Sequence, residues 1–212
     1  MIKRIIFDVD NTLLNTNKDC EDAYRKFFIE KFGKDYSKEL YDLIEDYDKV
    51  SGSYEVEDLI KYVSENAPFE YREEDFKDTY AEYRKHATLM EACTPEVLKE
   101  LSKKYEIVAL TNWYYIDQKA RLEKAGIAKY FTEIYAFENA GLKPNPKVYN
   151  IARGTHEFNE CLFVGDSISK DVIAPEKEGM KAVWYNPNKE EGEYLNIQSL
   201  KELTSLLEGG KL

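Results

Sequence analysis

The sequence predicts an α/β protein whose core is a parallel sheet interrupted by an inserted helical segment. In the second half of the chain, short apolar runs alternate with helical patterns, which is typical of a parallel sheet covered by helices on both faces. Between the first strand and this alternation, residues 15–92 carry only helical patterns. We therefore expect a core domain of residues 1–14 and 93–212 and a helical domain of residues 15–92.

Length and composition fit a globular protein with a sizeable core. Of the 212 residues, 43% are hydrophobic and 33% are charged, which is ordinary for a folded soluble chain. No apolar run is long enough to cross a bilayer, and the N-terminus leads directly into a strand instead of a signal peptide. The three cysteines are scattered, which is typical of free thiols in a reducing compartment. We therefore expect a cytoplasmic protein without a membrane partner.

The net charge of −11 argues against nucleic acid as a partner, because a phosphate backbone attracts basic surfaces. Most of this negative charge lies in residues 15–92. We expect it to form the solvated outer face of the helical domain.

Four apolar stripes at helical spacing predict four helices in the inserted segment. Gly33 ends the first stripe, residues 51–53 separate the second from the third, and Ala67-Pro68 separates the third from the fourth. Helices with short connections can bury such stripes against one another as a small bundle. The stripes are Tyr24, Phe27, Phe28 and Phe32; Leu40, Leu43, Ile44 and Tyr47; Val56, Leu59, Ile60 and Val63; and Phe76, Tyr80, Tyr83 and Ala87.

Strands and helices alternate through the rest of the chain. The first strand begins at Ile5, and Thr94-Pro95 is typical of a helix start, with a capping hydroxyl followed by proline. Short apolar runs predict the further strands at residues 107–110, 134–137, 161–164 and 182–185. Helical patterns and their stop signals predict helices near residues 94–104, 116–125, 147–153, 175–179 and 197–207.

Two acidic residues follow the first strand. Asp8 and Asp10 are one residue apart, so in an extended chain their side chains can point to the same face. Two carboxylates that close repel each other unless a cation lies nearby or one of them is protonated. Together with the hydroxyl of Thr12, the pattern suits a divalent-metal site for nucleophilic and acid–base chemistry. The alternative is a strand that ends in an ordinary Asp/Asn turn.

Polar residues also follow the second and fourth strands of the core. Thr111 and Asn112 come after the second strand. Asp166 and Asp171 come after the fourth, and Lys143 lies in the loop before it. Ligands of open parallel sheets bind at the carboxyl ends of the strands, so these groups can converge on one crevice. Each alone has an ordinary interpretation as a turn, a solvated lysine or a strand end, but their order along the chain favours a site.

These groups resemble the motifs of the haloacid dehalogenase-like (HAD) superfamily of hydrolases, and the resemblance covers nearly the whole chain. The inserted helices are similar to the α-helical bundle cap of some members. The resemblance implies a Rossmann-like core with a cap domain that closes over the crevice. The stretches that carry it are residues 7–13 (FDVDNTL), Leu110-Thr111-Asn112, Lys143-Pro144, and Gly165-Asp166-Ser167 with Asp171.

The resemblance implies Mg²⁺-dependent hydrolysis of a phosphomonoester through an aspartyl-phosphate. Asp8 would be the nucleophile, and Asp10 would act as general acid and then as general base. Asp8, Asp166 and the main-chain carbonyl of Asp10 would bind Mg²⁺. Asp171 would hold a metal-bound water.

Further residues would contact the substrate. Thr111, with the main-chain N–H groups after Asp8, would hold the transferring phosphoryl oxygens. Lys143 would balance the charge of Asp8 and of the phosphate. Thr12 and Asn112 are further predicted substrate-binding residues of the motifs.

Asp10 distinguishes two reaction classes of the superfamily. The carbon–halogen hydrolases that resemble this chain at the nucleophile lack the second aspartate. Its presence favours phosphoryl chemistry, because a general acid can protonate the leaving oxygen. The alternatives are a phosphomutase on the same scaffold and a non-catalytic phospholigand-binding protein.

Two groups of residues bear on the substrate. Trp113 and the two tyrosines after it follow the second strand, where they can stack on a nucleobase or sugar, or pack against a neighbouring helix. Lys18, Arg25 and Lys26 can reach a second anionic group of a substrate, or be ordinary surface residues. We expect a small phosphorylated metabolite as partner, a nucleoside monophosphate or a sugar phosphate, and a monomer or homodimer.

Overall fold

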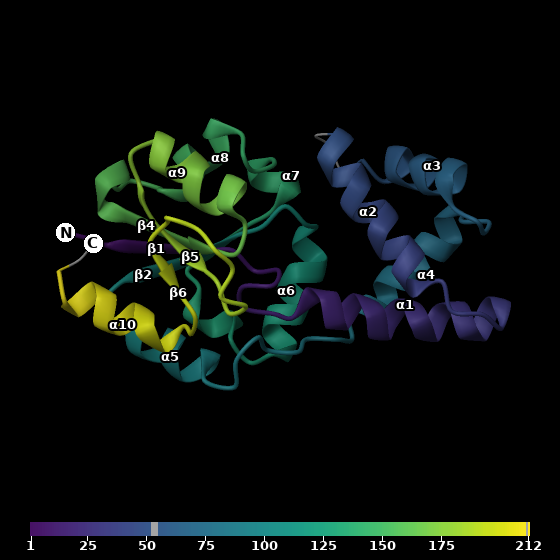
Figure 1. The fold of residues 1–212 in the computed structure, drawn as a ribbon, viewed down its shortest axis with the longest axis horizontal. Coiled ribbons are helices and arrows are strands. Elements are labelled where there is room, and N and C mark those ends of the chain that lie inside the picture. The colour runs from purple at the N-terminus through teal and green to yellow at the C-terminus, as the bar shows by residue number, and fades with distance from the viewer. Residues whose placement is uncertain (52–54, 211) are drawn as a thin grey trace. The chain divides into compact units, whose positions relative to one another are not determined.

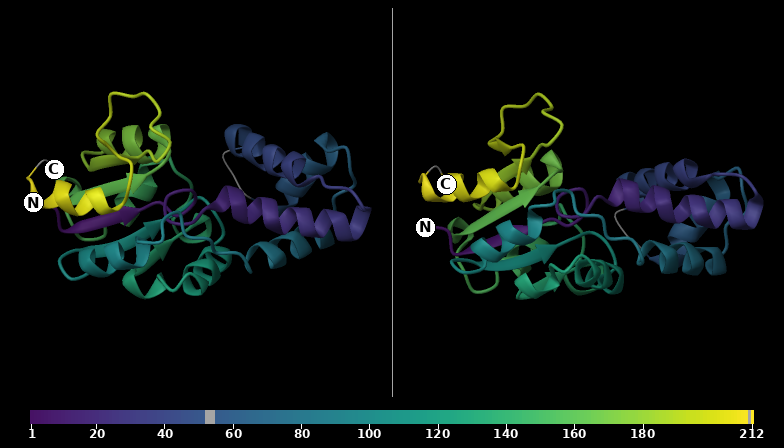
Figure 2. Two further views of the ribbon diagram at one scale, coloured as in Figure 1. Left: turned by 60° about the horizontal axis from the view of Figure 1, so that its bottom comes forward. Right: turned by 90° about the horizontal axis from the view of Figure 1, so that it is seen from below.

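The computed structural model describes residues 1–51, 55–210 and 212, without the side chains of residues 48–50. The predicted break at residues 51–53 therefore lies mostly outside the described part of the chain. Figure 1 shows the arrangement of the elements, and Figure 2 shows two further views.

The described residues form two compact units. The core unit comprises residues 1–15 and 89–212, and the helical unit comprises residues 16–88. Residues 15 and 89–92, which the sequence analysis assigns to the helical domain, thus belong to the core unit.

A six-stranded sheet forms the centre of the core unit (Figure 1). The strands are β1 (Arg4–Phe7), β2 (Glu106–Leu110), β3 (Glu133–Tyr135), β4 (Cys161–Gly165), β5 (Lys181–Tyr185) and β6 (Asn196–Ile197). Their order is β3-β2-β1-β4-β5-β6, and every neighbouring pair is parallel. The predicted α/β class with a parallel sheet is therefore confirmed. Because β1 lies between β2 and β4, the residues that follow these three strands meet at one edge of the sheet.

Helices cover both faces of this sheet, because successive side chains of the buried strands point to opposite faces. In β1, Ile5 and Phe7 belong to the apolar cluster on one face and Ile6 to the cluster on the other. The first cluster includes residues of α5 (Thr94–Leu101), α6 (Tyr115–Lys124) and α10 (Lys201–Glu208). The second includes residues of α8 (Pro146–Ala152) and α9 (Ala174–Lys177), on the opposite side of the sheet in Figure 1.

The core differs from the sequence prediction at the third strand, at the last helix and in the segment before α9. The predicted strand 134–137 ends at Tyr135, because Phe137 begins the short helix α7 (Phe137–Ala140), whose start is stabilised by a hydrogen bond from Ala136 N to Asn139 Oδ1 of 2.7 Å. The predicted helix 197–207 begins only at Lys201, because Asn196 and Ile197 pair with β5 as a sixth strand. A π-helical turn over Ile168–Ile173, which the sequence analysis did not predict, precedes α9.

The helical unit contains the four predicted helices: α1 (Thr16–Phe32), α2 (Ser37–Ser51), α3 (Val56–Asn66) and α4 (Glu73–Tyr83). α1 packs on α2 and α4, and α2 packs on α3. Aromatic rings supply much of this packing, as in the edge-to-face pair of Phe28 and Phe69 with centroids 4.7 Å apart. Within the described residues of both units, no helix has the length and apolar character needed to cross a membrane.

Candidate active site

A tight turn after β1 brings the hydroxyl of Thr12 back to the carboxylate of Asp8. The turn depends on Asn11, whose φ of 57° lies in the left-handed region that asparagine tolerates better than most residues. It is closed by hydrogen bonds from Asn11 N to Leu14 O and from Leu13 N to Val9 O. As a result, Thr12 Oγ1 donates to Asp8 Oδ2 at 3.0 Å and lies 3.4 Å from Asp166 Oδ1.

Lys143 forms the basic centre of the site. Its buried ammonium lies 2.6 Å from Asp8 Oδ1 and 2.7 Å from Asp171 Oδ1. The side chain of Asn112 orients this lysine: its Oδ1 accepts from Lys143 N at 2.7 Å, and its Nδ2 donates to Lys143 O at 3.0 Å. Asn112 was predicted to bind substrate, and here both of its polar groups contact the main chain of Lys143. Any direct contact with substrate stays a prediction.

Three of the predicted metal ligands lie together. Carboxylate oxygens of Asp8, Asp166 and Asp171 are all within 4.8 Å of one another. Ser167 N donates to Asp171 Oδ2 at 3.0 Å, which fixes the Asp171 carboxylate. Gly165 allows this approach, since a Cβ at that position would collide with the Asp171 side chain. Carboxylate oxygens that converge in this way suit a hard divalent cation such as Mg²⁺ as ligands.

The electrostatics of the cluster point in the same direction. Burial raises the pKa of Asp8 well above its usual value, against the effect of Lys143. Burial and the nearby Asp171 carboxylate raise the pKa of Asp166 to about 7. Although burial opposes the charged form of Lys143, the carboxylates of Asp171 and Asp8 raise its pKa. The carboxylates are crowded, and a divalent cation among them would offset their repulsion.

Asp10 does not share the position of these three carboxylates. Its Oδ1 lies 3.0 Å from Arg121 Nη1, and its Oδ2 accepts from Thr111 Oγ1 at 3.1 Å and from Gln118 Nε2. These contacts involve the Asp10 carboxylate. Metal binding by the main-chain carbonyl of Asp10 stays a prediction. Thr111, predicted to hold phosphoryl oxygens, contacts Asp10 here.

Gln118 and Arg121 were not predicted from the sequence. They lie on α6, three residues apart, and both are buried. A signal exists in the sequence: this helix has few apolar residues for a face that must pack against the core, so polar residues have to occupy it. Their partner Asp10 lies more than a hundred residues earlier, so local patterns do not identify the contact.

The two remaining predicted residues are Trp113 and Lys18. Trp113 Nε1 donates to Asp117 Oδ2 at 3.2 Å, and the indole packs edge-on against Tyr114 with ring centroids 5.2 Å apart. Lys18 lies in the helical unit, on α1, where its ammonium is 2.8 Å from Asp22 Oδ2. The role of either residue in substrate binding stays a prediction.

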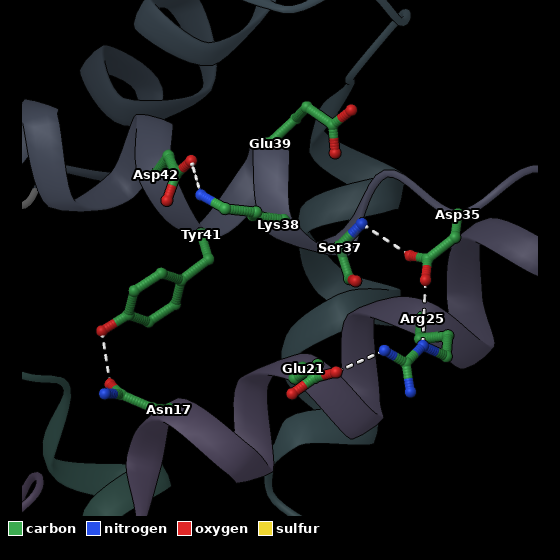
Figure 3. Close-up of a pocket in the computed structure, with 9 residues that line it drawn as sticks. All are labelled: Asn17, Glu21, Arg25, Asp35, Ser37, Lys38, Glu39, Tyr41 and Asp42. Atoms are coloured by element: carbon green, nitrogen blue, oxygen red, sulfur yellow. Dashed lines mark hydrogen bonds and ion pairs between the residues drawn. The ribbon is translucent and has the colours of Figure 1, made fainter.

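A pocket of about 570 Å³ lies in the helical unit between α1 and α2 (Figure 3). The charged side chains drawn there are largely paired with one another. Arg25 contacts Asp35 at 2.9 Å and also Glu21, and Lys38 contacts Asp42. Arg25 thus has two carboxylate partners. Lys26, which does not line the pocket, pairs with Glu82 at 2.8 Å. The pairing of the charges that line the pocket weakens it as an anion site.

The chain was compared with known proteins. A family model described as Haloacid dehalogenase-like hydrolase matches residues 5–185. A glyceraldehyde 3-phosphate phosphatase of Methanopyrus kandleri is 30% identical over 202 residues, which cover 86% of this chain and 83% of that protein. The pyrimidine 5'-nucleotidase YjjG of Escherichia coli is 29% identical over 133 residues, which cover 56% of this chain and 59% of that protein.

Similarity also extends to solved structures. The crystal structure of the HAD-hydrolase YfnB of Bacillus subtilis, bound to magnesium, has a TM-score of 0.82 at 19% identity and covers 97% of this chain and 98% of that chain. Identity at this level shows the fold alone. The chain spans about half the length of several curated relatives that it matches. The family match over residues 5–185 and the phosphatase relative both lead to one conclusion: the chain belongs to the haloacid dehalogenase-like hydrolases.

Proposed function

We propose that this chain is a Mg²⁺-dependent phosphatase that hydrolyses a small phosphomonoester through an aspartyl-phosphate on Asp8. The observation that carries the proposal is the pair of aspartates after β1, with Asp8 beside Lys143 and Asp10 held by Thr111. An alkyl phosphomonoester has a poor leaving group unless the leaving oxygen is protonated, and Asp10 can supply that proton. Relatives named as phosphatases and nucleotidases support the same class of substrate.

The first half-reaction transfers the phosphoryl group to the enzyme. An Asp8 carboxylate oxygen forms a bond to phosphorus, while the bond from phosphorus to the ester oxygen breaks. The Asp10 carboxyl gives its proton to that ester oxygen, so the substrate leaves as an alcohol. Lys143 offsets negative charge on Asp8 and on the phosphoryl group. The Thr111 hydroxyl donates to Asp10 here, so its contact with a phosphoryl oxygen stays a prediction.

The second half-reaction releases phosphate. Asp10, now a carboxylate, takes a proton from a water molecule as the water oxygen forms a bond to phosphorus. The bond between phosphorus and the Asp8 oxygen then breaks, which restores the Asp8 carboxylate and frees inorganic phosphate. One aspartate pair therefore serves both steps, first as nucleophile and acid, then as leaving group and base.

The Mg²⁺ ion would be held by Asp8 and Asp166, with Asp171 beside them. The three carboxylates fit this ion, because hard divalent cations prefer oxygen ligands and usually take only a few from the protein. When bound, the ion supplies positive charge that lets an anionic nucleophile approach an anionic phosphate.

The proposed substrates are nucleoside monophosphates and sugar phosphates. Trp113, Tyr114 and Phe137 form a chain of edge-on aromatic contacts close to the end of β2, with centroids 5.2 and 6.3 Å apart. Such rings can contact a base or the apolar face of a sugar. The helical unit is proposed to be the cap of this site. If the aromatic rings contact the substrate, Trp113→Ala will change the kcat/KM for nucleotides relative to sugar phosphates; an unchanged ratio would remove this part of the proposal.

The test is a phosphate-release screen over a panel of nucleoside monophosphates, sugar phosphates and triose phosphates. We expect hydrolysis of at least one of them with Mg²⁺ and none when the metal is chelated. Isomerisation of a sugar phosphate without net phosphate release would indicate a phosphomutase. Absence of turnover of every monoester, with Mg²⁺ present and the protein folded, would refute the proposed activity.

A further inference from the structure

We propose that Gln118 and Arg121 are positioning residues that hold the carboxyl group of Asp10 where it transfers the proton to the leaving oxygen. The inference rests on the proposed function, because it gives these two residues a role only if Asp10 is the general acid. It adds two side chains from α6 to a site otherwise built from loops at the strand ends.

Both oxygens of the Asp10 carboxylate have donors from the core unit. Arg121 Nη1 binds Oδ1 at 3.0 Å, while Thr111 Oγ1 at 3.1 Å and Gln118 Nε2 bind Oδ2. A carboxylate held at both oxygens has a defined position and a defined plane, whereas a single contact would leave it free to rotate.

The donors themselves are fixed in turn. Gln118 Oε1 accepts from Arg121 Nη1 at 3.0 Å, so the amide group of Gln118 directs its Nε2 to Asp10 and to Thr111 Oγ1, the latter at 3.0 Å. Because the two residues are three apart on one helix, they lie on the same face of α6. The result is one hydrogen-bonded network of four side chains, in which three donors surround the carboxyl group of Asp10.

Burial of this network is one-sided. The side chains of Gln118 and Arg121 are fully buried, but the side chain of Asp10 is 28% exposed. The Asp10 side chain is thus held by buried donors while part of it remains accessible, which suits a proton donor to a bound substrate.

A second buried arginine shows what a purely structural role looks like. Arg4 binds Glu106 Oε1 at 2.7 Å and Ala152 O at 2.6 Å, at the amino end of the sheet. Its partners are no part of the proposed site. Arg121 resembles Arg4 in burial and in having a carboxylate partner, so Arg4 offers a matched control for the loss of a buried guanidinium.

The role predicts a dependence on the leaving group. An alkoxide leaves poorly without a proton, so an alkyl phosphate depends on a well-placed acid. The nitrophenolate of para-nitrophenyl phosphate and the acetate of acetyl phosphate are stable anions that leave without one. Loss of the position of Asp10 should therefore slow alkyl esters selectively. The parameter to measure is kcat/KM, since it reports the steps up to departure of the leaving group and not the later attack of water.

The experiment compares Gln118→Leu and Arg121→Met with wild type and with Arg4→Met. Each protein is assayed with Mg²⁺ on the best alkyl ester of the phosphate-release screen and on para-nitrophenyl phosphate or acetyl phosphate. For both α6 variants we expect kcat/KM for the alkyl ester to fall by on the order of a hundredfold. We expect it to change little for the activated ester, and the ratio to stay at the wild-type value in Arg4→Met.

Each outcome decides a separate point. Equal losses on the two esters, or an Arg4→Met variant with the same selective loss, would overturn the positioning role while leaving the phosphatase activity intact. A wild-type protein that hydrolyses neither ester would refute the proposed function instead. If Arg121→Met fails to fold, as judged by its thermal transition, Gln118→Leu decides the matter by the same ratio, because leucine has a similar volume and leaves no buried charge unpaired.

Discussion

Both ends of the core sheet carry ion pairs, but the carboxylate pKa values are shifted in opposite directions at the two ends. At the amino end, Glu106 is surrounded by donors: Arg4 binds it through two nitrogens, and His156 Nε2 lies 2.8 Å from Oε2. Burial acts to raise the pKa of Glu106, but the hydrogen bonds from His156 and Arg4 lower it below its usual value. The carboxylate is stabilised, and the network is a balanced structural unit.

At the carboxyl end, acidic groups outnumber the bases that contact them. In the described part of the core unit, Lys143 lies between two carboxylates of a cluster of three, and the pKa values of Asp8 and Asp166 are raised. Proteins tolerate such crowding chiefly where it serves binding or catalysis. In this protein, an ion pair with a buried arginine is present at both ends, and only the carboxyl end adds a cluster of three carboxylates.

The strongest test of this contrast is removal of the proposed nucleophile. Asp8→Asn keeps the shape of the side chain but removes the attacking oxygen anion, so we expect kcat to fall by at least about 10⁴-fold. The measurement is phosphate release on the best substrate of the screen. Arg4→Met, at the amino end, should keep a kcat close to that of wild type. An Asp8→Asn enzyme within a factor of about ten of wild type would contradict covalent catalysis by this residue.

Metal binding should stabilise the folded protein through the acidic cluster at the carboxyl end. A ligand that binds only the folded state and is present at a hundred times its Kd adds about 2.7 kcal/mol to the free energy of unfolding. For a chain of this size, that raises Tm by roughly 5–10 °C. We expect that shift when Mg²⁺ is added to chelator-treated protein. Asp166→Asn should largely abolish it, and Glu106→Gln should leave it unchanged. A full shift in Asp166→Asn would contradict the assignment of the cluster as the metal site.

Much of the fold could be predicted because the long buried elements carry their own periodicity. The stripes of α1 to α4 and the apolar runs of the main strands identify these elements without any knowledge of their neighbours. β6 was not predicted, because its two residues, Asn196 and Ile197, are too few to form a recognisable pattern. They form a strand only by pairing with β5. The π-helical turn over Ile168–Ile173 likewise has no local signature.

The candidate site divides in the same way. Asp8, Thr12 and Asp166 are predictable because they lie in the turns that follow β1 and β4, and neighbouring parallel strands bring their ends together. Gln118 and Arg121 are not, since their importance depends on a long-range contact with Asp10 that only the packing of α6 creates. Trp113 has a predictable position, but the sequence does not show that its indole is fixed by Asp117.

Removal of Arg4 should affect stability without affecting catalysis. Arg4→Met leaves Glu106 and the Ala152 carbonyl without the guanidinium that binds them, which costs about 2 kcal/mol. The figure is modest because the Glu106 side chain is 32% exposed and water can replace part of the interaction. Urea unfolding measures the loss, and kcat/KM should remain near wild type. A large loss of activity with unchanged stability would mean that the amino end is coupled to the site and that the two ends do not differ as described.

The smallest expected effect tests whether the folded state lowers the pKa of Glu106 at the amino end. Because the folded state lowers the pKa of Glu106 below 4.5, its carboxylate contributes stability above about pH 4.5 and loses it as the pH falls through the folded-state value. Glu106→Gln should therefore be roughly 1 kcal/mol less stable than wild type near pH 7, and the difference should shrink in acid.

The groups that face this carboxylate are Arg4, His156 and Thr132. Since the acids of the carboxyl end have raised pKa values, their contribution runs the other way, and only the difference between variant and wild type isolates Glu106. A difference that stays constant through the acid range would mean that Glu106 is not stabilised as an anion, and the contrast between the two ends would then rest on the carboxyl end alone.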